Sequence, residues 1–192
     1  MQKEMKVSGM RKQLGIIVFF SVFAALAGSG CGMQSENESD GILNVYDVVP
    51  YDVQFVFPDG WENTTDDSPY DLQMKNEDRY YCSIFGYKDI DLPNDMTPED
   101  LFEFQKEDIF DKRDFVELVK EEPVWEDEYK NIYRELYSGE LEGNKYYYYC
   151  CMIDFKEPSE SLAWVIFSGT PSWIEHDLED LNQILITSES VK

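Results

Sequence analysis

The sequence has a single histidine, four cysteines and few basic residues: 16 Lys and Arg stand against 40 Asp and Glu, a formal net charge of −24 over 192 residues. Phosphate binding depends on clustered Lys and Arg, so this balance argues against nucleic acid as a partner. The same charge opposes direct adsorption to an anionic bilayer. The chain is nevertheless 43% hydrophobic and 15% aromatic, which excludes a disordered acidic tail and predicts one folded domain.

Motifs of catalysis are also missing. The chain has no Gly-x-Ser-x-Gly, no phosphate-cradling glycine-rich loop and no His-Glu-x-x-His. His176 stands between Glu175 and Asp177, and no signature links it to a cysteine nucleophile, so we predict a surface histidine. Carboxylate pairs are too abundant in this sequence to indicate a glycosidase. We therefore predict that the protein is not an enzyme.

The N-terminal segment has the order of a secretory signal. Four basic residues within positions 3–12 precede an apolar run of 14 residues, 14–27, which is shorter than the roughly 20 that a membrane-spanning helix needs. Small residues follow the run and lead to Cys31. The segment Leu26-Ala27-Gly28-Ser29-Gly30-Cys31-Gly32 resembles a bacterial lipobox, although Gly28 stands where that motif usually has Leu or another apolar residue.

The lipobox resemblance implies that Cys31 is lipidated on sulfur and becomes the new N-terminus. It predicts a protein anchored by lipid at the bacterial cell membrane, on the extracytoplasmic face. The alternative is an ordinary signal peptide in which Cys31 is incidental.

These features divide the chain into three parts. Residues 1–30 are the predicted lipoprotein signal peptide, 31–44 the lipidated cysteine with a flexible acidic tether, and 45–192 the folded domain. Without residues 1–30 the chain keeps 12 basic and 39 acidic residues, a net charge of −27 over 162 residues.

Three cysteines remain beside Cys31, and an odd number cannot form a complete set of disulfides within the chain. Adjacent residues of a strand face opposite sides, so Cys82 can pair with only one of Cys150 and Cys151. We interpret all three as small buried residues; a disulfide from Cys82 is the alternative. A zinc site is disfavoured because no Cys-x-x-Cys pair is present.

The sequence pattern of the domain predicts two helices and several strands, of which the central ones are buried on both faces. Residues 146–155 and 162–167 carry apolar or aromatic side chains on both faces, so both faces need cover. Thr97-Pro98-Glu99-Asp100 predicts the start of a helix ending near Lys112-Arg113, with Phe104 on its buried arc and Lys106 outside it. A second helix is predicted from Ser172, with a capping box to Glu175. The expected fold is α+β, a central antiparallel sheet covered by helices on both faces.

The segment Phe55-Val56-Phe57-Pro58-Asp59-Gly60-Trp61 is similar to the opening strand and turn of the PsbP-like family. The helix start at Thr97, the later hairpin and the closing strand–helix pair follow the same order as in that family. The resemblance covers residues 45–190 and implies an α-β-α sandwich. It also implies a non-enzymatic assembly or binding factor, of a kind that occurs among bacterial lipoproteins.

Two groups of residues are candidate sites. Asp89, Asp91 and Asp95 have a spacing similar to positions of a calcium-binding loop, but that loop's glycine and final glutamate are missing, and a plain loop is the alternative. Tyr133, Tyr137, Tyr146 and Tyr148 are predicted on neighbouring strands, as core packing or as a platform for a sugar or peptide.

We therefore expect a non-catalytic, membrane-anchored binding or accessory module, with no obligate cofactor. Its partner is expected to be a basic protein or a cation, because the acidic domain attracts positive surfaces. The alternative function is a receptor for a divalent cation such as Ca²⁺ or for a small ligand.

Overall fold

The computed structural model describes residues 43–191, except for positions 50, 78, 94–95 and 157. The predicted signal peptide, Cys31 and nearly all of the predicted tether lie outside the described residues, and so does Asp95. Within the described part of the chain, no helix has the length and apolar character needed to cross a membrane.

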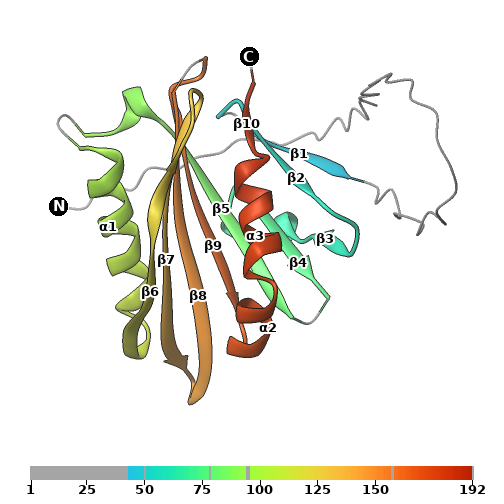
Figure 1. Cartoon of the computed structure of the whole chain (residues 1–192), viewed down its shortest axis with the longest axis vertical. Coiled ribbons are helices and arrows are strands. Elements are labelled where there is room, and N and C mark those ends of the chain that lie inside the picture. The colour runs from blue at the N-terminus through green and yellow to red at the C-terminus, as the bar shows by residue number, and fades with distance from the viewer. Residues whose placement is uncertain (1–42, 50, 78, 94–95, 157, 192) are drawn as a thin grey trace, which may run out of the picture. The chain divides into compact units, whose positions relative to one another are not determined.

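The described residues form ten strands, three α-helices and two 3₁₀ turns (Figure 1). In chain order these are β1 (Asn44–Val48), β2 (Val53–Phe57), β3 (Trp61–Asn63), η1 (Thr65–Asp67), β4 (Leu72–Asn76), β5 (Tyr80–Lys88), η2 (Asp89–Asp91), α1 (Pro98–Phe110), β6 (Asp114–Glu126), β7 (Lys130–Leu141), β8 (Asn144–Phe155), β9 (Ser161–Gly169), α2 (Pro171–His176), α3 (Leu178–Ile186) and β10 (Glu189–Ser190).

Seven strands form one antiparallel sheet in the order β3-β4-β5-β9-β8-β7-β6. The central hairpin of β7 and β8 turns at Glu142 and Gly143, which both have positive φ values, of 52° and 78°. Two such residues in succession match the twist of the flanking strands, as in a type I′ turn. This hairpin pairs Tyr137 with Tyr148 and so sets the tyrosines of both strands on a common face.

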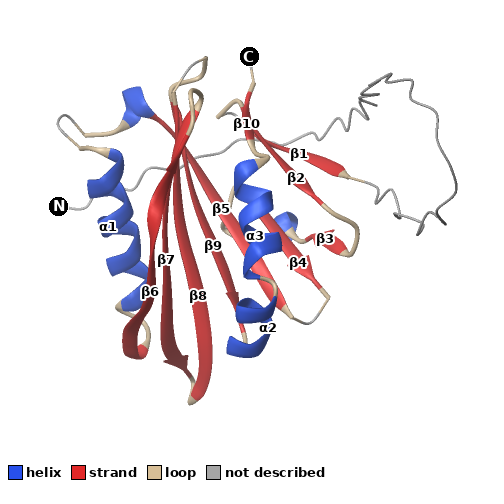
Figure 2. Ribbon diagram, viewed as in Figure 1, coloured by secondary structure: helices blue, strands red, loops and turns tan. Residues whose placement is uncertain are grey.

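Helices cover both faces of this sheet, as the sequence predicted (Figure 2). On β9 the even-numbered residues face α1 and the odd-numbered ones face the opposite core. Trp164 packs against Phe102 of α1 with ring centroids 5.7 Å apart, while Phe167 stacks with Tyr149 on the other face at 6.3 Å. The predicted double burial of β8 and β9 is confirmed.

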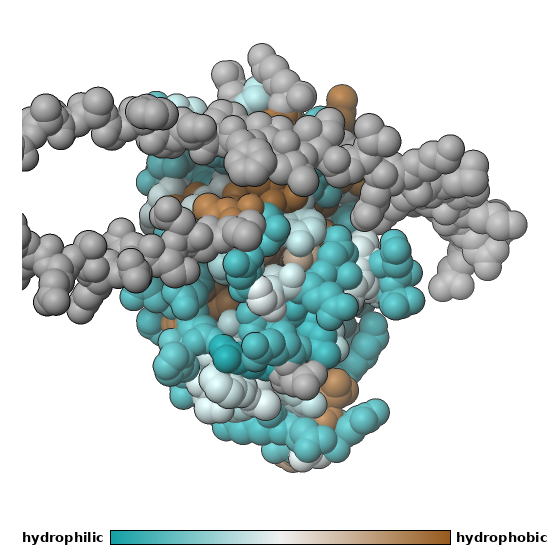
Figure 3. Space-filling model, turned by 90° about the vertical axis from the view of Figure 1, so that its right-hand side faces the viewer, coloured by the Kyte–Doolittle hydropathy of each residue, from teal (hydrophilic) through white to brown (hydrophobic). Residues whose placement is uncertain are grey.

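A second, small sheet shares the cover of the face opposite α1. Strands β1, β2 and β10 form it, and β2 contributes Val53, Phe55 and Phe57 to the same core as α2 and α3. The segment quoted for the family resemblance is therefore split: β2 belongs to the small sheet, while Trp61 begins β3 at the edge of the large one. The view in Figure 3 shows the side that carries β1–β3, where hydrophilic residues predominate.

The second helix begins earlier than predicted and is broken. Thr170 is its N-cap, without a side-chain hydrogen bond, and Pro171 is its first residue, so the predicted capping box from Ser172 to Glu175 is wrong. Proline at the first position already supplies the required φ angle. Asp177 ends α2 and begins α3, and its buried carboxylate accepts a hydrogen bond from the hydroxyl of Tyr80 at 3.0 Å.

The start of α1 is confirmed and its buried arc is corrected. The Thr97 hydroxyl accepts from the Asp100 amide at 3.1 Å, and the Asp100 carboxylate accepts from the Thr97 amide, a complete capping box. Phe104, predicted to be buried, is exposed, and Lys106, predicted to be outside, is buried. The helix ends at Phe110, short of the predicted Lys112-Arg113.

Candidate functional site

An acidic groove lies where α1 meets the edge strand β6 and its neighbour β7. Its cavity volume is about 170 Å³. Nine residues line it: Glu99, Phe102, Glu103, Glu121, Glu122, Val124, Tyr133, Arg134 and Glu135. Helix α1 presents the glutamates of its first turns, while the pleat of β7 turns Tyr133 and Glu135 toward the helix.

Lys106 forms ion pairs with two of these glutamates, Glu103 and Glu135. Its ammonium lies 2.7 Å from Glu103 and 2.5 Å from Glu135, and 4.4 Å from the ring centroid of Phe102. Burial alone would lower the pKa of Lys106, but the hydrogen bonds that its ammonium donates to both carboxylates outweigh burial and raise the pKa above its ordinary value. The lysine therefore stays charged and neutralises charge inside the groove wall.

The outer part of the groove has more acidic than basic side chains, although Lys120 lies 2.5 Å from Glu122 and Arg134 also lines the groove. Glu121 pairs across the strands with Glu135, and like charges placed opposite each other repel. The Glu121 side chain makes no ion pair or hydrogen bond with any other described residue. Arg134 donates to Asn182 at 2.9 Å and to the Pro123 carbonyl at 2.8 Å, so its hydrogen bonds go to neutral acceptors.

The four tyrosines of the sequence prediction all lie on the α1 side of the sheet. Tyr133 lines the groove and donates to Glu99 at 2.7 Å, and Tyr137 donates to Glu135 at 2.6 Å. Tyr148 is buried under Phe110, and Tyr146 is half-buried beside it. The tyrosines thus reach the groove only through Tyr133, and a role as a ligand platform stays a prediction.

A second cavity of about 310 Å³ adjoins the N-terminus of α1. Asp89, Pro98, Asp154, Phe155, Lys156, Glu160 and Leu162 line it. Burial raises the pKa of Asp154 above its ordinary value, even though Asn131 donates to its carboxylate at 3.2 Å. Of the predicted calcium ligands, Asp89 lines this cavity and Asp91 ends η2, while Asp95 is not described. Among the described residues, no three His, Cys, Asp or Glu side chains are placed to hold a metal ion.

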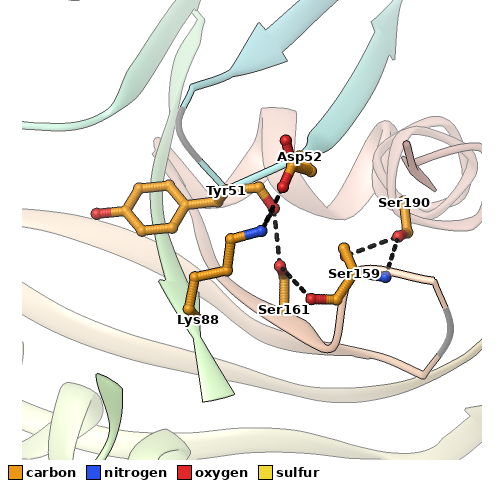
Figure 4. Close-up of polar contacts among 6 residues, drawn as sticks. All are labelled: Tyr51, Asp52, Lys88, Ser159, Ser161 and Ser190. Atoms are coloured by element: carbon orange, nitrogen blue, oxygen red, sulfur yellow. Dashed lines mark hydrogen bonds and ion pairs between the residues drawn. The ribbon is translucent and has the colours of Figure 1, made fainter. Parts of the chain in front are cut away.

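A polar cluster that the sequence did not reveal joins the small sheet to the large one (Figure 4). Lys88 of β5 donates to the Tyr51 carbonyl at 3.2 Å and lies 2.5 Å from the Asp52 carboxylate. The Ser161 hydroxyl donates to the same carbonyl at 2.7 Å, and Ser190 donates to Ser159 at 2.6 Å. The Ser161 hydroxyl donates to a carbonyl, and the Lys88 ammonium is paired with the Asp52 carboxylate. The cluster therefore joins the two sheets and does not activate a nucleophile.

The remaining chemically reactive side chains are placed as predicted. Cys82, Cys150 and Cys151 are free thiols buried in the two cores, and burial raises the pKa of each. The interpretation of these three as small buried residues is confirmed, and no disulfide joins them. His176 is exposed and lies 2.5 Å from the buried carboxylate of Asp177.

Comparison with solved structures defines the class of fold. No protein-family model matches the chain, and no curated protein matches it. The structure nevertheless has the PsbP/Mog1-type fold, an α+β arrangement with a large antiparallel sheet and few helices.

Three solved structures illustrate the likeness. Cyanobacterial PsbP (CyanoP) from Synechocystis sp. PCC 6803 is 15% identical, with a TM-score of 0.57, over 82% of this chain and 97% of that one. The Ran-binding protein Mog1p of Saccharomyces cerevisiae is 9% identical, with a TM-score of 0.53, over 80% and 97%. LpqN of Mycobacterium tuberculosis, a protein involved in cell envelope biogenesis, is 10% identical, with a TM-score of 0.52, over 81% and 88%.

Proposed function

We propose that this protein is a non-catalytic accessory module, anchored by lipid on Cys31 to the extracytoplasmic face of a bacterial membrane, that binds a basic protein through the acidic groove. The observation that carries the proposal is the distribution of charge. Residues 98–128, which contain α1 and β6, have 13 acidic and 4 basic residues. Two basic side chains near this segment are turned inward, because Lys106 pairs within the groove wall and Lys130 is buried against backbone carbonyls. Lys112 and Lys120 stay exposed, each beside an acidic partner.

Two further observations support this reading. Two of the similar structures, Mog1p and LpqN, are described by a protein partner or an envelope process rather than by a reaction. The described residues also offer no activated nucleophile, since the thiols are buried and the hydroxyl of Ser161 is held by a carbonyl.

Binding of a basic probe tests the groove. We expect a short lysine-rich peptide to bind the mature protein with an affinity that falls steeply with salt, because exposed charges are screened within about 10 Å at 0.1 M ionic strength. The matched control is a peptide with glutamate in place of lysine. Equal binding of the two peptides, or binding that salt leaves unchanged, would contradict the proposal.

Labelling with a radioactive fatty acid tests the anchor. We expect the protein to incorporate the label in its bacterial host and the Cys31→Ala variant to lose it. Undiminished labelling of the variant would rule out lipidation at Cys31.

A second candidate function is a receptor for a divalent cation or a small ligand, and the cavity beside Asp89 and Asp154 favours it. Binding of Ca²⁺ there would raise the melting temperature in millimolar Ca²⁺ relative to chelator. An unchanged melting temperature, with no heat of binding in calorimetry, would dismiss the cation form of this candidate.

A further inference from the structure

Strand β6 is an edge of the large sheet with unusual side chains. It pairs with β7 on one side and with no other described strand. Nearly all of its residues are exposed or half-exposed, and four of them are large and apolar: Phe115, Leu118, Val119 and Val124. Edge strands are normally short or shielded, since their unpaired backbone groups can recruit another chain.

Among the five described non-glycine residues with positive φ, Phe115 is the bulky apolar one. Its φ is 51°, in the left-handed region that a bulky residue rarely adopts, and it lies within the first irregularity of the β6–β7 register. Its side chain is 77% exposed, so no burial within the domain compensates for the strained backbone. Strain of this kind persists mostly where function requires it.

The acidic groove runs beside this edge. Leu118 pairs with Tyr137 and Glu121 pairs with Glu135, which places both side chains on the α1 face. An extended chain lying along β6 would therefore find an apolar contact at Leu118 and an unpaired carboxylate at Glu121 on the same face. A second copy of this protein would bring its own acidic edge against this one, and repulsion disfavours it.

We infer that β6 is a docking edge, to which an extended segment of the basic partner, with alternating apolar and Lys or Arg residues, adds as a further strand. The backbone of that segment would pair with the outer edge of β6, and its basic side chains would reach Glu121 and Glu99. This mode is β-strand addition, in which backbone hydrogen bonds supply affinity and alternate side chains supply specificity. The inference rests on the proposed function and adds the form of the partner and the place where it binds.

The register limits the length of the added strand. Three irregularities interrupt the β6–β7 pairing, between Asp114 and Glu117, Leu118 and Lys120, and Glu122 and Trp125. Pro123 also lacks a backbone donor. These features shield most of the edge against long pairing. Lys120, Glu121 and Glu122 pair without interruption, so we expect a short strand over residues 117–122 that accommodates the irregularity between Leu118 and Lys120.

The test uses two short synthetic peptides and the mature protein. The first alternates Lys and Val, and the second has the same side chains with N-methyl groups on alternate amides, which blocks backbone pairing and keeps the charge. We expect the first to bind at least about tenfold more tightly and to protect amides of residues 117–122 from hydrogen exchange. Equal affinities, without protection in β6, would overturn strand addition and leave a purely electrostatic groove. Failure of both peptides to bind would count against the proposed function as well.

Variants locate the site. We expect Glu121→Lys to weaken the Lys/Val peptide about tenfold, and Glu179→Lys, the same charge change at an exposed position of α3, to weaken it less than about twofold. Phe115→Ser and Leu118→Ser should each weaken it, whereas Ile90→Ser, at an exposed apolar residue of η2, should not. Unchanged affinity in Glu121→Lys, Phe115→Ser and Leu118→Ser would overturn the assignment to β6. Circular dichroism of each variant confirms that it is folded.

Discussion

The two faces of the large sheet are closed in different ways. The face under α2, α3 and the small sheet is a continuous apolar core that extends from β2 to β7. The face under α1 has a smaller core, and its border holds a buried lysine, several tyrosine hydroxyls and the acidic groove. The difference teaches that apolar packing alone closes one face, while the other ends in a charged groove beside the unpaired edge of β6.

The largest expected effect on stability comes from a substitution in the apolar core under α2 and α3. We expect Phe167→Ala to cost about 4 kcal/mol of unfolding free energy, because a fully buried ring leaves a cavity among rigid strands. Phe102→Ala, under α1, should cost about 2–3 kcal/mol, since the groove beside it allows relaxation. Denaturant unfolding of both variants measures the difference, and a larger loss in Phe102→Ala would contradict the comparison.

The two buried lysines give the next effect. Lys130 donates to the carbonyls of Leu185, Ile186 and Ser188 at the end of α3, so Lys130→Met should destabilise the protein by about 2–3 kcal/mol. Lys106→Met should cost about 1–2 kcal/mol, because its partner Glu103 is largely exposed and can turn to water, while its buried partner Glu135 keeps the hydrogen bond from Tyr137. Chemical unfolding at neutral pH compares the two, and equal stability of Lys130→Met and the parent would show that the carbonyls find other donors.

Contact between the two sheets is tested at a glycine. A Cβ added at Gly86 would lie 2.2 Å from the ring of Tyr51, so Gly86→Ala should cost about 2 kcal/mol. The control is Gly139→Ala in β7, where the nearest atoms are 3.4 Å away and little change is expected. Thermal unfolding measures both, and similar melting temperatures would mean that the ring of Tyr51 moves aside without cost.

The next comparison is between the N-caps of the helices on the two faces, and its expected effect on stability is smaller. Thr97→Ala removes the hydroxyl acceptor, which is one half of the capping box of α1, and we expect the free energy of unfolding to fall by about 1 kcal/mol. Thr170→Ala, at the start of α2, should change the stability by much less, since this hydroxyl makes no capping hydrogen bond. Equal losses in urea unfolding would show that the capping box contributes nothing.

The smallest expected effect is a change of the free energy of unfolding with pH. Burial lowers the pKa of Lys130 to about 8 from its ordinary 10.5. Between these values the unfolded chain binds the proton and the folded chain does not, so the free energy of unfolding should rise with pH. Lys106 behaves oppositely, because its pKa is raised in the folded protein. Its contribution to the free energy of unfolding is full below pH 10.5, the ordinary pKa, and is lost as the pH rises above that value. Unfolding followed from about pH 7 to about pH 9.5 should show a rise that Lys130→Met abolishes; a rise retained in that variant would assign the slope to another group.

The sequence by itself determined the local and periodic features. Alternation on β8 and β9 required cover on both faces, and the Thr97-Pro98 pair defined the start of α1, because both depend only on neighbouring residues. Its composition also determined that the domain is strongly acidic. Whether Cys31 carries lipid and whether Asp95 contributes to a cation site remain predictions that lie outside the described residues.

Only the tertiary structure decided which acidic and basic residues meet. The burial of Lys106 and the exposure of Phe104 reverse the helical pattern, because carboxylates of α1 and of β7, far apart in sequence, share one ammonium. The placement of β2 in a separate sheet and the break at Asp177 also depend on distant contacts, to α3 and to Tyr80. The groove and its edge strand arise from strand order, which sequence periodicity does not encode.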